Sequence, residues 1–347
     1  MPTPPASDGA ASPRRPRRAL GNGLLALASL AVAAGVGEVG LRFYDPLKRV
    51  PVVPPMAERL AYSGRHEVTQ VAHGNVFGTV QPSGDADTVY ALKPGREWLY
   101  EGARVRTNVH GFRGDDWPEA KPPGTLRLVA LGDSVTFGWG VGQDETYVER
   151  LAASVRALPD VAPVEALNCA VPGYNAAQEA ALFDTRLRRF GPDVVLLGYV
   201  LNDHEPAVFD SARGVEALLE RSYLFEVVRR AAERPFLAPR RVTRAFARLA
   251  SAARAAGAPV LVFTWPQPVP GADPALPRRL AERNGFTYVD VDPALRASYR
   301  EKGLRGLDDL ALNPRDPHPN AEGHRLLAQA LTPAVTDALR AARRAAR

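Results

Sequence analysis

The sequence predicts an α/β protein with a five-stranded parallel sheet, preceded by a small β-rich segment and an N-terminal transmembrane helix. Two observations carry this prediction. From residue 125 onward, short apolar runs alternate with stretches of helical periodicity. Such alternation produces a parallel sheet with helices on both faces. Near the N-terminus, residues 19–37 contain no charged side chain.

Residues 1–18 are basic and rich in proline and alanine, and we expect them to be disordered. Residues 19–37 form the predicted signal anchor, since a helix of that length spans on the order of 28 Å, close to the thickness of a bilayer's hydrocarbon core. Four arginines precede the anchor, and they favour a cytoplasmic N-terminus with everything after Glu38 outside the cytoplasm. A cleaved signal peptide remains the alternative, because Ala31-Val32-Ala33 suits a signal peptidase.

The charge distribution argues against a nucleic-acid-binding protein, and the cysteine content argues against a fold held by disulfides. The net charge is +6, yet the two chain ends carry eight arginines, four within residues 14–18 and four within 340–347. The body is therefore nearly neutral, and we expect no nucleic-acid partner. A single cysteine, Cys169, cannot form an internal disulfide, and we expect it to be a small buried apolar residue.

The remaining chain divides into a collar and a larger domain. Residues 38–124 are predicted to form a linker and a β-rich collar, with short strands near 88–92 and 104–109. Residues 125–347 form the predicted catalytic domain, with a helical insertion at 204–242. Two interpretations of the insertion remain open: a helical lid over the site, or an amphipathic segment that packs on the side of the domain. The predicted strands of the domain are 126–131, 164–169, 193–200, 259–264 and 286–291. Its predicted helices are 145–158, with Asp144 as N-cap, and 176–190.

Four polar blocks follow predicted strands or precede a helix. They are Gly132-Asp133-Ser134, Gly173, Asn202-Asp203 and Asp316-Pro317-His318. Because the carboxyl ends of parallel strands share one edge of a sheet, we expect the blocks to meet there. A serine hydroxyl needs a base to take its proton, a carboxylate to orient the base, and N–H donors for the oxyanion. The blocks supply each of these groups.

The blocks and their order resemble the SGNH hydrolases, also called the GDSL family, over roughly residues 125–340. Two further stretches, Arg106 to Gly114 and Leu126 to Val141, resemble a membrane-anchored bacterial subgroup. The resemblance implies a three-layer, flavodoxin-like fold and an extracytoplasmic serine esterase, periplasmic or on the cell surface, that needs no cofactor. The implied catalytic residues are Ser134, His318 and Asp316, and the implied oxyanion donors are the Ser134 and Gly173 amides and the Asn202 side chain.

Two positions depart from the family pattern. The third block is usually Gly-x-Asn-Asp, but here Val200 precedes Asn202 by two positions and the glycine is at Gly198. Asp316 and His318 have one residue between them instead of two, a spacing similar to some polysaccharide-modifying members. Asp316 is the predicted orienting carboxylate, with Asp308 and Asp309 as alternatives.

Other interpretations remain weaker. There is no Gly-x-Ser-x-Gly elbow and no phosphate-binding loop. Asp316, His318 and His324 could suggest a metal ion, but no second carboxylate–histidine cluster with ligand spacing accompanies them, so no metal site is predicted. The His324 side chain is expected to be structural. The substrate is expected to be an acyl or acetyl ester of a small alcohol, a lipid or a glycan. The alternatives are an O-acyltransferase or deacetylase acting on a cell-surface polysaccharide, and a non-catalytic binding protein on the same scaffold. His204 could either touch substrate or face solvent.

Overall fold

The computed structural model describes residues 16–44, 70–71, 79–100, 102–161, 163–200, 203–204, 222–232, 236–267, 273–314 and 316–345. The chain divides into two units, which are described separately. Met1–Val52 and Ala212–Ala231 form the first, and Val53–Ser211 and Ala232–Arg347 form the second.

The second unit is built on a five-stranded sheet whose paired strands are all parallel, as predicted. Its order is β10-β9-β8-β6-β7. The strands are β6 (Leu126–Gly132), β7 (Val164–Asn168), β8 (Val194–Tyr199), β9 (Val260–Thr264) and β10 (Thr287–Tyr288). Since β7 and β8 lie on opposite sides of β6, the direction of winding reverses at β6. Ligands of open α/β sheets bind outside the strand ends at such a switch point.

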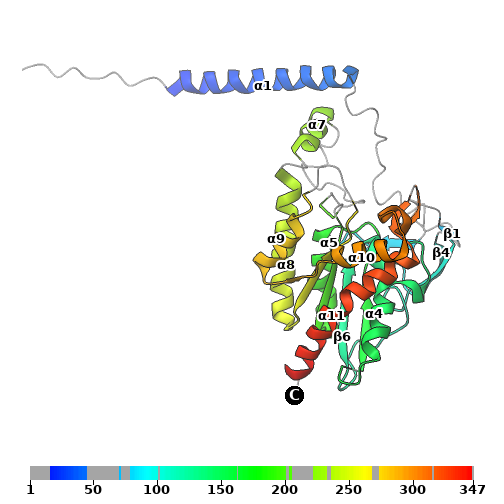
Figure 1. The fold of residues 1–347 in the computed structure, drawn as a ribbon. Coiled ribbons are helices and arrows are strands. Elements are labelled where there is room, and N and C mark those ends of the chain that lie inside the picture. Colours follow the sequence, from blue (N-terminus) through cyan, green and yellow to red (C-terminus); the bar gives the residue numbers. More distant parts are fainter. Residues whose placement is uncertain are drawn as a thin grey trace, which may run out of the picture. The chain divides into compact units, whose positions relative to one another are not determined.

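Helices cover both faces of this sheet, as Figure 1 shows. Alternate residues of β6 explain why: Leu128 and Ala130 point into one apolar cluster, and Val129 and Leu131 into the other. The first cluster includes α4 (Tyr147–Arg156), α10 (Asp292–Lys302) and α11 (Ala321–Ala345), and the second includes α5 (Ala176–Leu182), α8 (Ala238–Ala256) and α9 (Leu276–Asn284). The three-layer α/β architecture is thus confirmed.

The β-rich collar precedes the sheet. It contains β1 (Gln70–Val71), β2 (Val80–Pro82), β3 (Tyr90–Leu92), β4 (Glu97–Tyr100) and β5 (Ala103–Arg106). Buried collar side chains such as Tyr90 and Trp98 belong to the same apolar cluster as α5 and α8. The Tyr90 hydroxyl donates to the Pro172 carbonyl at 2.8 Å. The collar therefore braces the loop that carries Gly173.

The first unit contains α1 (Pro16–Tyr44) and α7 (Tyr223–Ala232). The stretch Asn22–Leu41 of α1 is long and apolar enough to cross a membrane, and none of it is buried. A carboxylate oxygen of Glu38 accepts hydrogen bonds from the Ser222 hydroxyl and the Leu224 amide, both at 2.8 Å. Of the predicted insertion, residues 205–221 and 233–235 lie outside the described part of the chain, and its last residues begin α8.

Candidate active site

Ser134 stands at the switch point of the sheet. It is the first residue of α3 (Ser134–Phe137), separated from the end of β6 by Asp133 alone, and it is 9% exposed. Asp133 is the N-cap of α3, and its Oδ1 accepts the Val135 amide at 2.9 Å. The short strand-to-helix turn thus presents the serine hydroxyl at the edge of the sheet while the aspartate carboxylate is used locally.

Asp316 and His318 lie on β12 (Asp316–Pro319), which pairs antiparallel with β11 (Ala311–Asn313). Asn320 fixes the end of this hairpin, because its side-chain oxygen accepts the Glu322 and Gly323 amides at the start of α11, both at 3.0 Å. Its amide nitrogen donates to the Ala311 carbonyl at 3.0 Å. The imidazole and the carboxylate therefore share one braced turn.

The structure brings Ser134, His318 and Asp316 into one line of contacts. The Nε2 of His318 lies 2.7 Å from the Ser134 hydroxyl, and its Nδ1 lies 2.5 Å from Oδ1 of Asp316. The Asp316 side chain is 3% exposed and that of His318 is 21% exposed. A buried carboxylate on Nδ1 favours the tautomer that leaves Nε2 free to accept a proton from serine.

Of the alternative carboxylates, Asp309 is engaged elsewhere. It forms an ion pair with Arg305 at 2.7 Å, and that guanidinium and the Arg305 amide hold the pKa of Asp309 below its usual value. No contact between Asp308 or Asp309 and the His318 ring is seen. Among these three carboxylates, Asp316 is the one in hydrogen-bond contact with the imidazole.

Two of the three predicted oxyanion donors lie in the described residues. Gly173 has a φ of +78°, a left-handed conformation that favours glycine. Among the described residues, no backbone carbonyl accepts a hydrogen bond from the Gly173 amide or from the Ser134 amide. Asn202 lies outside the described residues, but its neighbour Asp203 exchanges two hydrogen bonds with Val200, at 2.8 and 2.9 Å.

The displaced glycine of the third block has a structural reason. Gly198 on β8 pairs with Gly132 on β6, and the Thr136 side chain of α3 lies over both. A Cβ on Gly198 would stand 2.3 Å from Oγ1 of Thr136. The glycine therefore lets α3 pack close against the sheet.

Two residues around the site were not singled out from the sequence. The buried Arg113 guanidinium donates to the carbonyls of Phe137, Gly138 and Val141, at 2.8, 2.5 and 2.6 Å. The Trp139 ring stacks on the His318 ring, with centroids 5.6 Å apart. Arg113 was visible only as part of the upstream stretch that resembles the family, and nothing local in the sequence indicates its acceptors.

The other candidate side chains are buried. Burial raises the pKa of the Cys169 thiol, which keeps it protonated. Burial lowers the pKa of His324 to about 3, and its Nδ1 accepts the Tyr147 amide at 3.2 Å. The His204 residue is also buried, and its carbonyl accepts from Arg241 at 2.5 Å.

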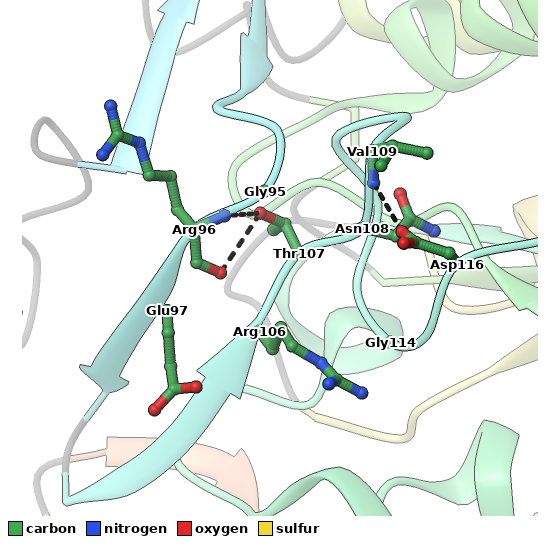
Figure 2. Close-up of a pocket in the computed structure, with 9 residues that line it drawn as sticks. All are labelled: Gly95, Arg96, Glu97, Arg106, Thr107, Asn108, Val109, Gly114 and Asp116. Atoms are coloured by element: carbon green, nitrogen blue, oxygen red, sulfur yellow. Dashed lines mark hydrogen bonds between the residues drawn. The ribbon is translucent and has the colours of Figure 1, made fainter.

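A hollow of about 290 Å³ lies in the collar, and none of its lining residues belongs to the Ser134 site. Figure 2 shows Thr107 hydrogen-bonded to Arg96, and the Val109 amide donating to Asp116 at 2.8 Å. These contacts satisfy groups within the collar itself. Among the described residues, no cluster of histidine, cysteine or carboxylate side chains could hold a metal ion.

The fold and the comparisons identify the class of protein. A family model described as GDSL-like lipase/acylhydrolase matches residues 130–326, which is more than half of the chain. The chain is a serine hydrolase that acts on ester bonds. It belongs to the GDSL-like lipase/acylhydrolase family, as the sequence resemblance predicted.

Solved structures resemble the chain more distantly. TesA is 17% identical, with a TM-score of 0.43, and the match covers 61% of this chain and 99% of that one. A catalytic mutant of Axe2, an acetylxylan esterase from Geobacillus stearothermophilus, is 16% identical, with a TM-score of 0.42, and the match covers 59% of this chain and 92% of that one. The psychrotrophic esterase EstA from Pseudoalteromonas sp. is 15% identical, with a TM-score of 0.41, and the match covers 61% of this chain and 97% of that one. No curated protein matches the sequence significantly.

Proposed function

We propose that this hydrolase cleaves carboxylic esters through a Ser134–His318–Asp316 triad and an acyl-enzyme. One observation carries the proposal: the serine hydroxyl lies 2.7 Å from a histidine nitrogen whose other ring nitrogen contacts a buried carboxylate. Hydrogen-bonded nucleophile, base and orienting group are the requirements for activating a serine.

Acylation begins when the Ser134 oxygen attacks the ester carbonyl carbon and His318 Nε2 takes the hydroxyl proton. The carbonyl π electrons move to oxygen, and the resulting oxyanion is bound by the Ser134 and Gly173 amides and the Asn202 side chain. When the tetrahedral intermediate collapses, the bond to the alcohol oxygen breaks and His318 returns its proton to that oxygen. Asp316 stabilises the transient imidazolium without becoming protonated.

Deacylation repeats the same steps with water. His318 takes a proton from the water as its oxygen attacks the acyl carbon, and the same donors bind the second oxyanion. Collapse releases the carboxylic acid and restores the Ser134 hydroxyl. We expect about 3 kcal/mol of barrier lowering from an oxyanion donor, so Asn202→Ala is expected to reduce kcat on the order of a hundredfold.

We also propose that α1 anchors the catalytic domain outside the cytoplasm, in the periplasm or at the cell surface. The support is the apolar stretch Asn22–Leu41, none of which is buried, together with the arginines that precede it. A cleaved signal peptide would leave a shorter chain, so the N-terminal sequence of the protein isolated from membranes distinguishes the two fates.

The test of the triad uses a fluorophosphonate probe and a soluble short-chain ester. We expect Ser134→Ala to lose probe labelling and at least a thousandfold of turnover. Ser154→Ala is the matched control, because Ser154 is an exposed serine on α4 whose hydroxyl only bonds the Arg150 carbonyl at 2.9 Å. Labelling and turnover that survive in Ser134→Ala would overturn the proposal. Release of free acid in the absence of an acceptor alcohol identifies hydrolysis.

A further inference from the structure

A buried arginine that follows the collar strands lies beside the turn that begins at Ser134. Arg113 belongs to the stretch Arg106 to Gly114, to which the chemistry above assigns no role. It is 1% exposed, and its backbone forms β-bridges with Thr107, just after β5, and with Asn168, the last residue of β7. Arg113 is therefore fixed at the carboxyl end of β7, the edge of the sheet at which the serine stands.

The turn that precedes Arg113 is tightly determined. The Asn108 side-chain oxygen accepts the His110 and Phe112 amides, both at 3.0 Å. Gly111 has a φ of +77°, and a Cβ there would stand 2.8 Å from a carbonyl oxygen of β3. A larger residue does not fit in this conformation. The asparagine and the glycine of this stretch thus set the position of the arginine.

The Arg113 guanidinium holds the turn that follows α3. Its Nη1 donates to the Phe137 and Gly138 carbonyls, and its Nη2 donates to the Val141 carbonyl. The last carbonyls of a helix have no partner within the helix, and Arg113 supplies one for each of these. Its Nε donates to the Gln143 side chain at 3.1 Å. A lysine ammonium cannot reproduce this planar arrangement of donors.

The same turn contacts both the proposed nucleophile and the proposed base. The Ser134 carbonyl accepts the Gly138 and Trp139 amides, both at 3.0 Å. The Trp139 ring stacks on the His318 ring. Gly140 packs so closely on the hairpin of His318 that a Cβ there would stand 2.3 Å from a side-chain carbon of β11. The position of the turn therefore affects how the imidazole faces the serine.

Two glycines make this turn easy to deform. Gly138 and Gly140 have φ values of +88° and +75°, and glycine reaches backbone conformations that other residues rarely adopt. Arg113 binds carbonyls on both sides of Trp139. The guanidinium thus clamps the segment that carries the indole.

We propose that Arg113 is a positioning residue for the Ser134–His318 pair. It holds Trp139 against the His318 ring and so keeps Nε2 of that ring at the Ser134 hydroxyl. The inference rests on the proposed function, because it assigns a further residue to that same site. A displacement of about 1 Å can cost on the order of a hundredfold in rate. Loss of Arg113 should lower kcat more than it changes KM, since the imidazole acts on the transferred proton.

The test compares Arg113→Lys and Arg113→Met in the full-length protein on a soluble short-chain ester. We expect Arg113→Lys to lower kcat about tenfold and Arg113→Met about a hundredfold, each with KM within about threefold. The lysine variant keeps the charge and part of the hydrogen bonding, so it decides the outcome if Arg113→Met does not fold. An Arg113→Lys enzyme with the original kcat would overturn the inference.

Arg127→Lys is the matched control. Arg127 is 0% exposed and also donates to three backbone carbonyls, but it lies near the start of β6, at the end of the strand far from Ser134. We expect Arg127→Lys to lower the free energy of unfolding and to leave kcat of the folded enzyme within about twofold. An equal loss of kcat in Arg113→Lys and Arg127→Lys would reduce the role of Arg113 to stability alone and refute the proposal.

A double-mutant cycle tests whether Arg113 acts through the indole. Trp139→Leu removes the ring that Arg113 supports, so adding Arg113→Lys to it should lower kcat further by less than about threefold. If the two losses instead multiply in full, Arg113 does not act through Trp139 and the inference is wrong.

A measurement without turnover separates this inference from the triad. In Ser134→Ala protein with isotope-labelled histidine, the Nδ1 proton of His318 is expected to give an NMR signal because Asp316 holds it. Adding Arg113→Lys should broaden that signal, since the ring is then less restrained, and an unchanged signal would contradict the positioning role. Turnover that survives in Ser134→Ala would refute the triad, and the His318 signal would still decide the role of Arg113.

Discussion

The His318 ring is held from two sides. Asp316 contacts its Nδ1 at 2.5 Å, and the Trp139 indole stacks on its face at 5.6 Å. Together the two contacts restrict the rotation of the ring, and its Nε2 lies 2.7 Å from the Ser134 hydroxyl.

The carboxylate contact gives a prediction at this scale. Asp316→Asn preserves the shape of the side chain but removes its charge, so the imidazole is free to adopt the wrong tautomer. We expect kcat to fall on the order of a thousandfold with little change in folding. Steady-state kinetics on a soluble ester checks this, with Asp308→Asn as the control. An Asp308→Asn protein that lost activity while Asp316→Asn kept it would move the orienting role to Asp308.

At the scale of elements, the sequence predicted four of the five strands within one residue at each end, because each is a short apolar run bounded by turn residues. The fifth strand was expected at 286–291, but it is only the two-residue β10 (Thr287–Tyr288). Helix starts were harder. Asp144 was expected to cap the first helix of the domain, which was wrong: Asp144 lies in a 3₁₀ turn, Gln143–Glu145, and Thr146 caps α4 by accepting the Glu149 amide at 3.2 Å. Both residues are good caps, and only the tertiary packing selects between them.

The proposed active site was predictable only in part, for a similar reason. Asp316 and His318 share one turn, so their contact follows from local sequence. The contacts of Arg113 join positions more than 20 residues apart and leave no periodic pattern. The pairing of β1 with β4 is likewise non-local, with only two residues in register. Long-range polar contacts of this kind are set by the folded shape.

Packing of α3 on the sheet leads to a prediction for Gly198. An added methyl group would stand 2.3 Å from the Thr136 hydroxyl oxygen and 3.0 Å from the Phe263 ring. We expect Gly198→Ala to cost about 1–3 kcal/mol of unfolding free energy and to lower kcat, because α3 carries Ser134. Urea unfolding measures the first effect.

A double-mutant cycle provides the control for Gly198. Thr136→Ala alone removes the hydrogen bond from the Tyr147 hydroxyl, 2.9 Å long. Combined with Gly198→Ala, it should cost less than the sum of the single changes, because the space is then free. Additive costs would show that the crowding is relieved elsewhere.

For the whole molecule, the buried His324 predicts a loss of stability in acid. Its pKa is about 3 in the folded protein and about 6.5 in an unfolded chain. Between these values the unfolded chain binds a proton that the folded protein does not, so stability is complete above about pH 6.5 and falls as the pH drops toward 3, by up to about 1.4 kcal/mol per pH unit.

Unfolding measured at several pH values checks the prediction for His324. His324→Gln cannot titrate, so its unfolding free energy should depend less steeply on pH between about 6 and 4. If the substitution also lowers the unfolding free energy at neutral pH through lost packing, that constant difference does not change the slope. Glu322, whose pKa the Arg325 and Lys302 contacts hold at about 2, adds its own acid loss in both proteins. Equal slopes in the two proteins would exclude His324 as an acid-sensitive group.

The contact between Glu38 and α7 bears on how this enzyme is prepared in soluble form. At ten residues, α7 is too short to be stable in isolation. Its first amides are satisfied by Ser222 and by Glu38, a carboxylate placed where the helix dipole is positive. Deleting everything through Tyr44 to improve solubility also deletes that carboxylate. We expect the shortened protein to show faster amide exchange at Leu224, so ester turnover measured on it describes an enzyme whose insertion has lost its partner.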